Sequence, residues 1–179
     1  MVGWYLLDGA RGDPILKTLL VFRHAKSSWG DETLDDHDRP LNQRGKKTAP
    51  LMGQWIAEQK TVPELILSST AKRAVSTVKK AAKTMGYQGE IVYDKHLYLA
   101  SPSTYLKVVR SYAKAHTRVM IVGHNPGLES LIQTMTGVKQ AMPTAALAEI
   151  GLEIESWQDL RDKTPGILRH FWLPRELFT

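Results

Sequence analysis

The chain has 179 residues, no cysteine and a formal net charge of +6 at pH 7. This length suits one domain with its own hydrophobic core, and the composition is that of an ordinary globular protein. The absence of cysteine excludes disulfides, thiolate metal sites and every enzyme that uses a cysteine nucleophile. The positive charge favours negatively charged ligands, but it does not separate a phosphorylated metabolite from a nucleic acid.

Residues 1–16 lack the basic start and the continuous apolar stretch of a signal peptide. We expect them to form a poorly ordered N-terminal extension instead. No later apolar run approaches the roughly 20 residues that a membrane span needs. We therefore expect a cytoplasmic protein without a membrane partner, whose single domain covers residues 17–179.

The body of the chain alternates buried-strand patterns with amphipathic helix patterns. Strands are predicted at 17–22, 64–67, 90–93 and 118–122, and helices at about 42–59, 71–85, 101–112 and 127–135. Nearly continuous apolar strands are typical of a parallel sheet that helices cover on both faces. The fold class that follows is α/β, with three α/β/α layers and a mostly parallel sheet.

The C-terminal part has a different pattern. Apolar residues alternate with glutamates over 148–155, which predicts a half-buried strand near an edge of the sheet. Residues 167–173 are its predicted partner. We therefore expect an antiparallel or edge strand near the C-terminus.

Histidines and arginines follow three of the predicted strands. Arg23 and His24 follow the first strand, Arg73 lies in the first helical turn after the second, and His124 follows the fourth. Because ligands of open α/β sheets bind beyond the carboxyl ends of the strands, we expect these four side chains to surround one bound anion.

Such a set suits phosphoryl transfer through a phosphohistidine. An unprotonated imidazole nitrogen is a nucleophile, two guanidiniums can hold the phosphoryl oxygens, and a second, protonated histidine would add a donor. Ser27 and the backbone of Asn125 are further candidate phosphate donors.

Competing site classes find less support. The sequence has no ATP-type phosphate loop, no H-E-x-x-H pair and no dinucleotide fingerprint. Residues 35–38 read Asp-Asp-His-Asp, but adjacent loop residues rarely all point at one ion, so we expect no metal and no other cofactor. Lysines and arginines are dispersed without an aromatic-interleaved patch, so no nucleic-acid partner is expected.

Three segments in this order resemble the histidine phosphatase (phosphoglycerate mutase-like) superfamily: R-H-A after the first strand, S-S-T-A-K-R-A-x-x-T and G-H-N-P-G-L-E. The segment 38–42 with Gly45, and the short chain, are similar to the SixA-type phosphohistidine phosphatase branch. The resemblance covers residues 17–173. It implies that His24 accepts the phosphoryl group and that Arg23, Arg73 and His124 line the phosphate pocket of a catalytic domain.

One departure from the superfamily concerns the general acid. Many members place a carboxylate after the third strand, but residues 96–102 contain none. Either Asp38 or Glu129 serves instead, or the leaving group needs little help, as in a phosphoramidate. The short connection between the third strand and its helix also leaves little room for a lid.

The leading hypothesis is therefore a metal-independent phosphatase that acts on protein phosphohistidine through a covalent phosphohistidine. A small-molecule phosphomonoesterase remains an alternative, as does a phosphate- or phosphopeptide-binding module with little turnover. The partner is a phosphorylated protein or a small phosphorylated substrate in each case.

Overall fold

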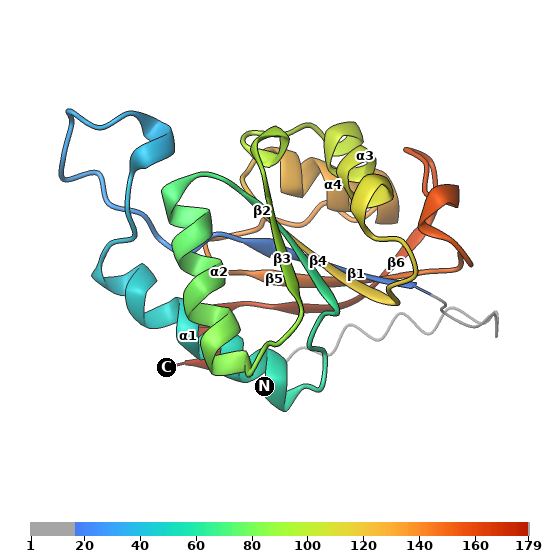
Figure 1. Ribbon diagram of the computed structural model, residues 1–179, viewed down its shortest axis with the longest axis horizontal. Coiled ribbons are helices and arrows are strands. Elements are labelled where there is room, and N and C mark those ends of the chain that lie inside the picture. The colour runs from blue at the N-terminus through green and yellow to red at the C-terminus, as the bar shows by residue number, and fades with distance from the viewer. Residues whose placement is uncertain (1–16, 179) are drawn as a thin grey trace.

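A computed structural model describes residues 17–178, and six strands of this part form one sheet in the order β3-β2-β4-β1-β5-β6 (Figure 1). The strands are β1 (Lys17–Arg23), β2 (Leu65–Ser69), β3 (Glu90–Asp94), β4 (Arg118–Gly123), β5 (Leu147–Leu152) and β6 (Gly166–Trp172). The helices are α1 (Gln43–Glu58), α2 (Lys72–Met85), α3 (Pro102–Tyr112), α4 (Gly127–Thr136) and the short α5 (Pro174–Leu177). The predicted extension 1–16 lies outside the described residues.

The sheet is mixed, with its parallel part first in sequence. The pairs β1–β4, β2–β4 and β2–β3 are parallel, whereas β5 pairs antiparallel with both β1 and β6. The predicted α/β class, with a mostly parallel sheet and antiparallel pairing near the C-terminus, is confirmed.

The expected exposure of the strand near residue 150 is wrong. Every residue of β5 is buried, because β5 lies between β1 and β6 and the edge position belongs to β6. Its one charged side chain, Glu149, is only 9% exposed and accepts a hydrogen bond of 2.8 Å from the Thr61 hydroxyl. That hydrogen bond lets a carboxylate occupy a position that the alternating pattern assigned to solvent.

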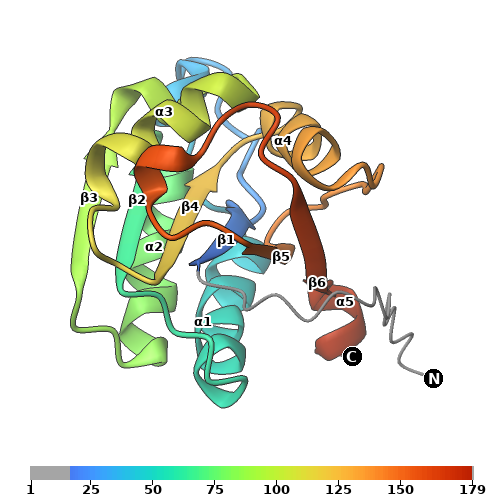
Figure 2. The ribbon, with the colours of Figure 1, turned by 90° about the vertical axis from the view of Figure 1, so that its right-hand side faces the viewer.

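Helices cover both faces of the sheet, as Figures 1 and 2 show. Side chains of β1 alternate between two cores: Leu19 and Val21 pack on the side of α3 and α4, and Leu20 and Phe22 pack on the side of α1 and α2. Burial on both faces explains why this strand is a continuous apolar run. It also holds the residues that follow β1 in a fixed place.

No helix within residues 17–178 is long and apolar enough to cross a membrane. The cytoplasmic location stays a prediction. So does the assignment of the whole chain after residue 16 to a single domain.

Candidate active site

The candidate active site lies where β1, β2 and β4 end. These strands are parallel and adjacent, so the residues that follow them share one edge of the sheet. The rings of His24 and His124 are 4.9 Å apart between centroids, and Arg73 Nε lies 3.3 Å from His24 Nε2. All three side chains are buried, with 2–6% exposure. The structure thus brings together three side chains that are far apart in sequence.

The contacts of His24 fix the position of its ring proton. Nδ1 lies 2.7 Å from the carbonyl oxygen of Ala25, which can only accept, so Nδ1 carries the proton. Nε2 receives the Nε–H of Arg73, which can only donate, so Nε2 holds the lone pair. The nitrogen with the lone pair is the one that faces the guanidinium. A neutral ring in this tautomer has the form that a nucleophile requires.

The pKa of His24 is lowered from 6.5 to about 4. Burial is the main cause, and the positive charges of Arg73, Arg23 and Arg39 add to it, while the hydrogen bond to Ala25 opposes them. Burial and the neighbouring positive charges disfavour a charged imidazolium and together outweigh the hydrogen bond to Ala25. His24 is therefore neutral at pH 7.

His124 is held at both its backbone and its ring. Its N–H donates to the Tyr105 hydroxyl at 3.1 Å, and its Nε2 lies 2.8 Å from Ser69 Oγ. Burial, followed by the nearby His24 and Arg73, lowers the pKa of His124 to about 3. A pKa in this range corresponds to a neutral ring at pH 7. A protonated second histidine facing a phosphoryl group stays a prediction.

Arg73 is held by Asp36, one of the acidic residues in the segment 35–38. Its Nη2 donates to Asp36 Oδ2 at 2.8 Å, and its Nη1 donates to the backbone carbonyl of Asp36. Asp36 belongs to a short 3₁₀ turn (Asp36–Asp38) in the segment that extends from the body between β1 and α1 (Figure 1). This loop therefore contributes to the site although it lies outside the regular elements.

The Asp36 carboxylate also binds two other residues. Tyr98 donates to Oδ2 at 2.6 Å, and Arg39 donates to Oδ1 at 2.6 Å. The hydrogen bond from Tyr98, together with those from Arg73 and Arg39, holds the pKa of Asp36 well below its ordinary value. Asp36 is therefore an anion at neutral pH.

Tyr98 and Arg39 were not identified as site residues from the sequence. The Tyr98 ring meets the His124 ring edge-on, with centroids 5.4 Å apart. Arg39 is 6% exposed, and its guanidinium carbon lies 3.2 Å from the centroid of the exposed Trp29 ring. Only the fold brings these residues to the site, because neither directly follows a strand.

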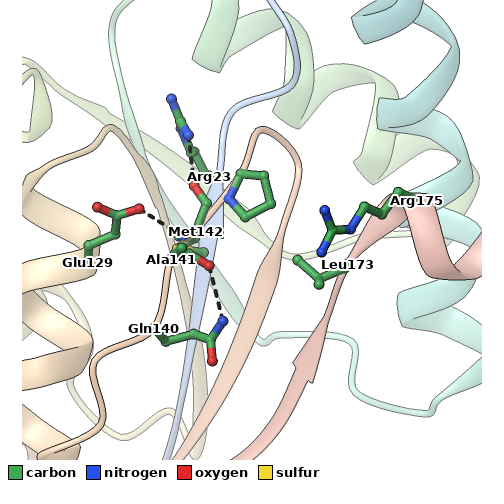
Figure 3. Close-up of a pocket in the computed structure, with 8 residues that line it drawn as sticks. Arg23, Glu129, Gln140, Ala141, Met142, Leu173 and Arg175 are labelled. Carbon is green, nitrogen blue, oxygen red and sulfur yellow. Dashed lines mark hydrogen bonds between the residues drawn. The ribbon is translucent and has the colours of Figure 1, made fainter. Parts of the chain in front are cut away.

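Arg23 points toward the chain that follows α4. Its Nη1 donates to the Met142 carbonyl at 2.7 Å, and its Nε has no hydrogen-bond partner among the described residues. A cavity of about 320 Å³ borders Arg23, between the loop that carries Met142 and the C-terminal residues Leu173 and Arg175 (Figure 3). His24, Arg73 and His124 do not line this cavity. It therefore adjoins the candidate site without being part of it.

The two further candidate phosphate donors lie near the site. Ser27 is buried, and its hydroxyl accepts a hydrogen bond of 2.7 Å from Arg39 Nη2. The Asn125 side-chain amide donates to Glu129 Oε1 at 2.7 Å and to the Met142 carbonyl at 2.9 Å. The amide group of Asn125 is thus engaged elsewhere, and the role of its backbone stays a prediction, as does that of Ser27.

The two candidate general acids have other partners in this structure. The Asp38 side chain is 62% exposed and lies 3.1 Å from His37 Nδ1. Glu129 Oε1 accepts from the Asn125 amide and from the Met142 N–H, at 2.7 and 2.8 Å, and so ties the start of α4 to the loop beside Arg23. Neither carboxylate hydrogen-bonds to His24, Arg73 or His124. Their role as acids stays a prediction.

Residues 17–178 contain no group of three or more His, Asp or Glu side chains arranged to hold a metal ion. In the segment 35–38, whose acidic residues had suggested a metal site, the Asp36 carboxylate accepts hydrogen bonds from Arg73, Arg39 and Tyr98.

Residues 19–98 match the model of the histidine phosphatase superfamily (branch 1). An uncharacterized protein of Mycobacterium leprae is 30% identical over 166 residues, which cover 86% of this chain and 99% of that protein. The chain therefore belongs to the histidine phosphatase superfamily.

Solved structures refine this assignment. SixA from Agrobacterium tumefaciens has a TM-score of 0.76 and 29% identity, over 88% of this chain and 98% of that chain. The protein histidine phosphatase SixA complexed with tungstate has the same fold, with a TM-score of 0.74 and 20% identity, over 89% of this chain and 99% of that one. Within the superfamily the chain falls in the SixA-type branch, and these findings support phosphatase activity.

Proposed function

We propose that this protein hydrolyses protein phosphohistidine through a covalent phosphohistidine on His24, without a metal ion. The observation that carries the proposal is the neutral His24 ring, whose lone pair on Nε2 lies 3.3 Å from Arg73 Nε. A nucleophile and a cation that can bind a phosphoryl oxygen thus share one buried spot.

The reaction has two displacements. In the first, the His24 Nε2 lone pair attacks phosphorus and the bond between phosphorus and the substrate imidazole breaks. The leaving nitrogen keeps the electron pair of the broken bond, and the proton stays on the other nitrogen of the substrate ring, so that the imidazole leaves neutral. In the second, water attacks phosphorus, the bond to Nε2 breaks, and orthophosphate leaves with His24 restored. Arg73, Arg23 and His124 stabilise the charge on the phosphoryl oxygens in both steps.

The substrate class follows from the surroundings of His24. No carboxylate lies in the segment 95–101 between β3 and α3, so an alkoxide would leave without an acid at that place. A protonated imidazole leaves more readily than an alkoxide does, which favours a phosphoramidate substrate. The same segment holds only one 3₁₀ turn, so no inserted lid rises there and a protein side chain can approach.

Rapid-quench labelling tests this proposal. Incubation with a ³²P-labelled phosphohistidine peptide should leave a label on the protein that survives base and is lost in acid. His24→Ala should abolish both the label and the turnover, whereas chelators should leave turnover unchanged. Full turnover by His24→Ala would refute the proposal.

The alternative of a binding module makes a different prediction. A module of this kind would retain a phosphopeptide or orthophosphate without releasing phosphate from phosphohistidine or p-nitrophenyl phosphate. A tautomer with its lone pair on Nε2 favours turnover, because a binder would need a donor at that position instead.

A further inference from the structure

Ser69 is a buried serine at the end of β2 that contacts the second histidine of the site. It is fully buried, and its Oγ lies 2.8 Å from His124 Nε2. The same oxygen accepts the Ala71 N–H at 3.2 Å. Ser69 thus joins the start of α2 to a ring that approaches the nucleophile His24.

The other nitrogen of the His124 ring has no partner. His124 Nδ1 is buried and makes no hydrogen bond to any described residue. A buried polar atom without a partner costs free energy, and at a functional site it indicates a group that a ligand would satisfy.

Two arrangements of the ring proton are possible, and they leave different groups unpaired. If Nε2 donated to Ser69, the serine hydroxyl hydrogen would lack an acceptor among the described residues, and Nδ1 would be a buried lone pair. If Ser69 donates to Nε2, only one group remains unpaired, the Nδ1–H. The second arrangement satisfies more of the buried groups.

We infer that Ser69 is a positioning residue that locks neutral His124 in the tautomer with its proton on Nδ1, so that this N–H donates to a bound phosphoryl oxygen. This inference rests on the proposed function, because it assigns the bound anion as the missing acceptor. A lone pair at Nδ1 would repel the same anion. The serine hydroxyl therefore decides whether His124 Nδ1 attracts or repels a bound anion.

This assignment removes the need for a charged second histidine. The lowered pKa of His124 keeps the ring neutral before an anion binds. A neutral ring can still donate one hydrogen bond if its tautomer is fixed from the other side. The site can then bind a phosphoryl group without first taking up a proton on His124.

The first experiment reads the tautomer directly. The ring nitrogens of the full chain are observed by ¹⁵N NMR at pH 7, and the His124 signals are those that vanish in His124→Asn. We expect a protonated Nδ1 and an unprotonated Nε2. A proton on Nε2 in the unsubstituted protein would overturn the inference, whatever the activity.

The second experiment removes the serine hydroxyl. In Ser69→Ala we expect the His124 ring to exchange between tautomers and the Kd for orthophosphate to rise by about tenfold, the loss of roughly one hydrogen bond to a charged group. Ser68→Ala is the matched control, because Ser68 is equally buried on the same strand but donates to the backbone carbonyl of Ser69. An unchanged His124 spectrum in Ser69→Ala would overturn the inference.

The two proposals can fail separately. The NMR measurement needs no turnover, so it tests only the effect of Ser69 on the His124 tautomer. Labelling of His24 tests only the proposed function. A correct tautomer in a protein that forms no phosphohistidine would retain the role of Ser69 at an anion site and reject the catalytic proposal.

Discussion

The Asp36 carboxylate and the Arg73 guanidinium form an ion pair of 2.8 Å beside the lone pair of His24. The Arg73 side chain is 4% exposed, whereas that of Asp36 is 44% exposed, so the pair lies at the boundary between the buried site and solvent. Arg73 therefore reaches the site already oriented. Its Nε–H points at His24 Nε2, and each Nη keeps one further N–H that Asp36 does not take.

Asp36→Asn should lower kcat/KM for p-nitrophenyl phosphate by about tenfold, because an amide keeps the shape but loses the charge that orients Arg73 and Arg39. The measurement is steady-state kinetics beside Asp35→Asn, which removes an equal charge from the exposed preceding residue, whose side chain makes no capping hydrogen bond. Equal kinetics in the two variants would show that the ion pair does not position Arg73.

The lowered pKa of His24 predicts an acid-dependent loss of stability. The His24 ring has a pKa of 6.5 in the unfolded chain and of about 4 in the folded protein. Between these two pH values, His24 therefore binds more protons in the unfolded chain. The free energy of unfolding should therefore fall as the pH decreases from about 6.5 to 4, with no further change from this group below 4. The full effect is about 3 kcal/mol.

Urea unfolding at pH 7 and pH 4.5 checks this prediction. The difference in the free energy of unfolding between the two pH values should shrink in His24→Gln and persist in His170→Gln, which replaces an exposed histidine on β6. The prediction is wrong if both variants lose as much stability on acidification as the unsubstituted protein does.

The sequence was sufficient for the parts of the site that follow strands. His24, Arg73 and His124 could be predicted to meet because parallel strands bring their carboxyl ends to one edge of the sheet. Asp36 and Tyr98 could not, because their contact joins two loops that are 62 residues apart, and no periodicity describes how loops pack. The ring contact of His124 could not be predicted either, because its partner Ser69 ends β2, the strand beside β4 in the sheet but 55 residues away in sequence.

The same limit explains the error at β5. An alternation of apolar residues and glutamates describes a half-exposed strand only when the polar side chains reach water. Glu149 instead finds the hydroxyl of Thr61, in the loop after α1, so a strand with that pattern lies inside the sheet. A hydrogen bond between residues so far apart in the chain cannot be predicted from the local sequence pattern.

Two substitutions of Glu129 distinguish a structural role of its carboxylate from a role as general acid. Its Oε1 accepts from Asn125 and from the Met142 N–H, and a glutamine oxygen can accept both hydrogen bonds. Glu129→Gln should therefore keep kcat within about twofold, whereas Glu129→Ala should lower it about tenfold by releasing the loop that holds Arg23. A large loss in Glu129→Gln would instead support the role of general acid. Asp38→Asn, at an exposed carboxylate, should leave kcat unchanged.

Gly45 in the first turn of α1 packs against the chain that follows His24. A Cβ at this position would overlap the backbone carbonyl oxygen of Lys26, a group that cannot rotate away. Gly45→Ala should therefore displace the segment after His24, lower the free energy of unfolding by about 2 kcal/mol and reduce kcat.

Gly30→Ala is the control for Gly45→Ala, because a Cβ there would lie 3.4 Å from Ser28 Oγ, in ordinary contact. Thermal unfolding and steady-state kinetics of both variants make the comparison. Since Asn42 caps the same helix by accepting the Gly45 N–H at 2.9 Å, a loss confined to Gly45→Ala would link the start of α1 to the position of the nucleophile. Normal stability in Gly45→Ala would mean that the Lys26 backbone can move without disturbing His24.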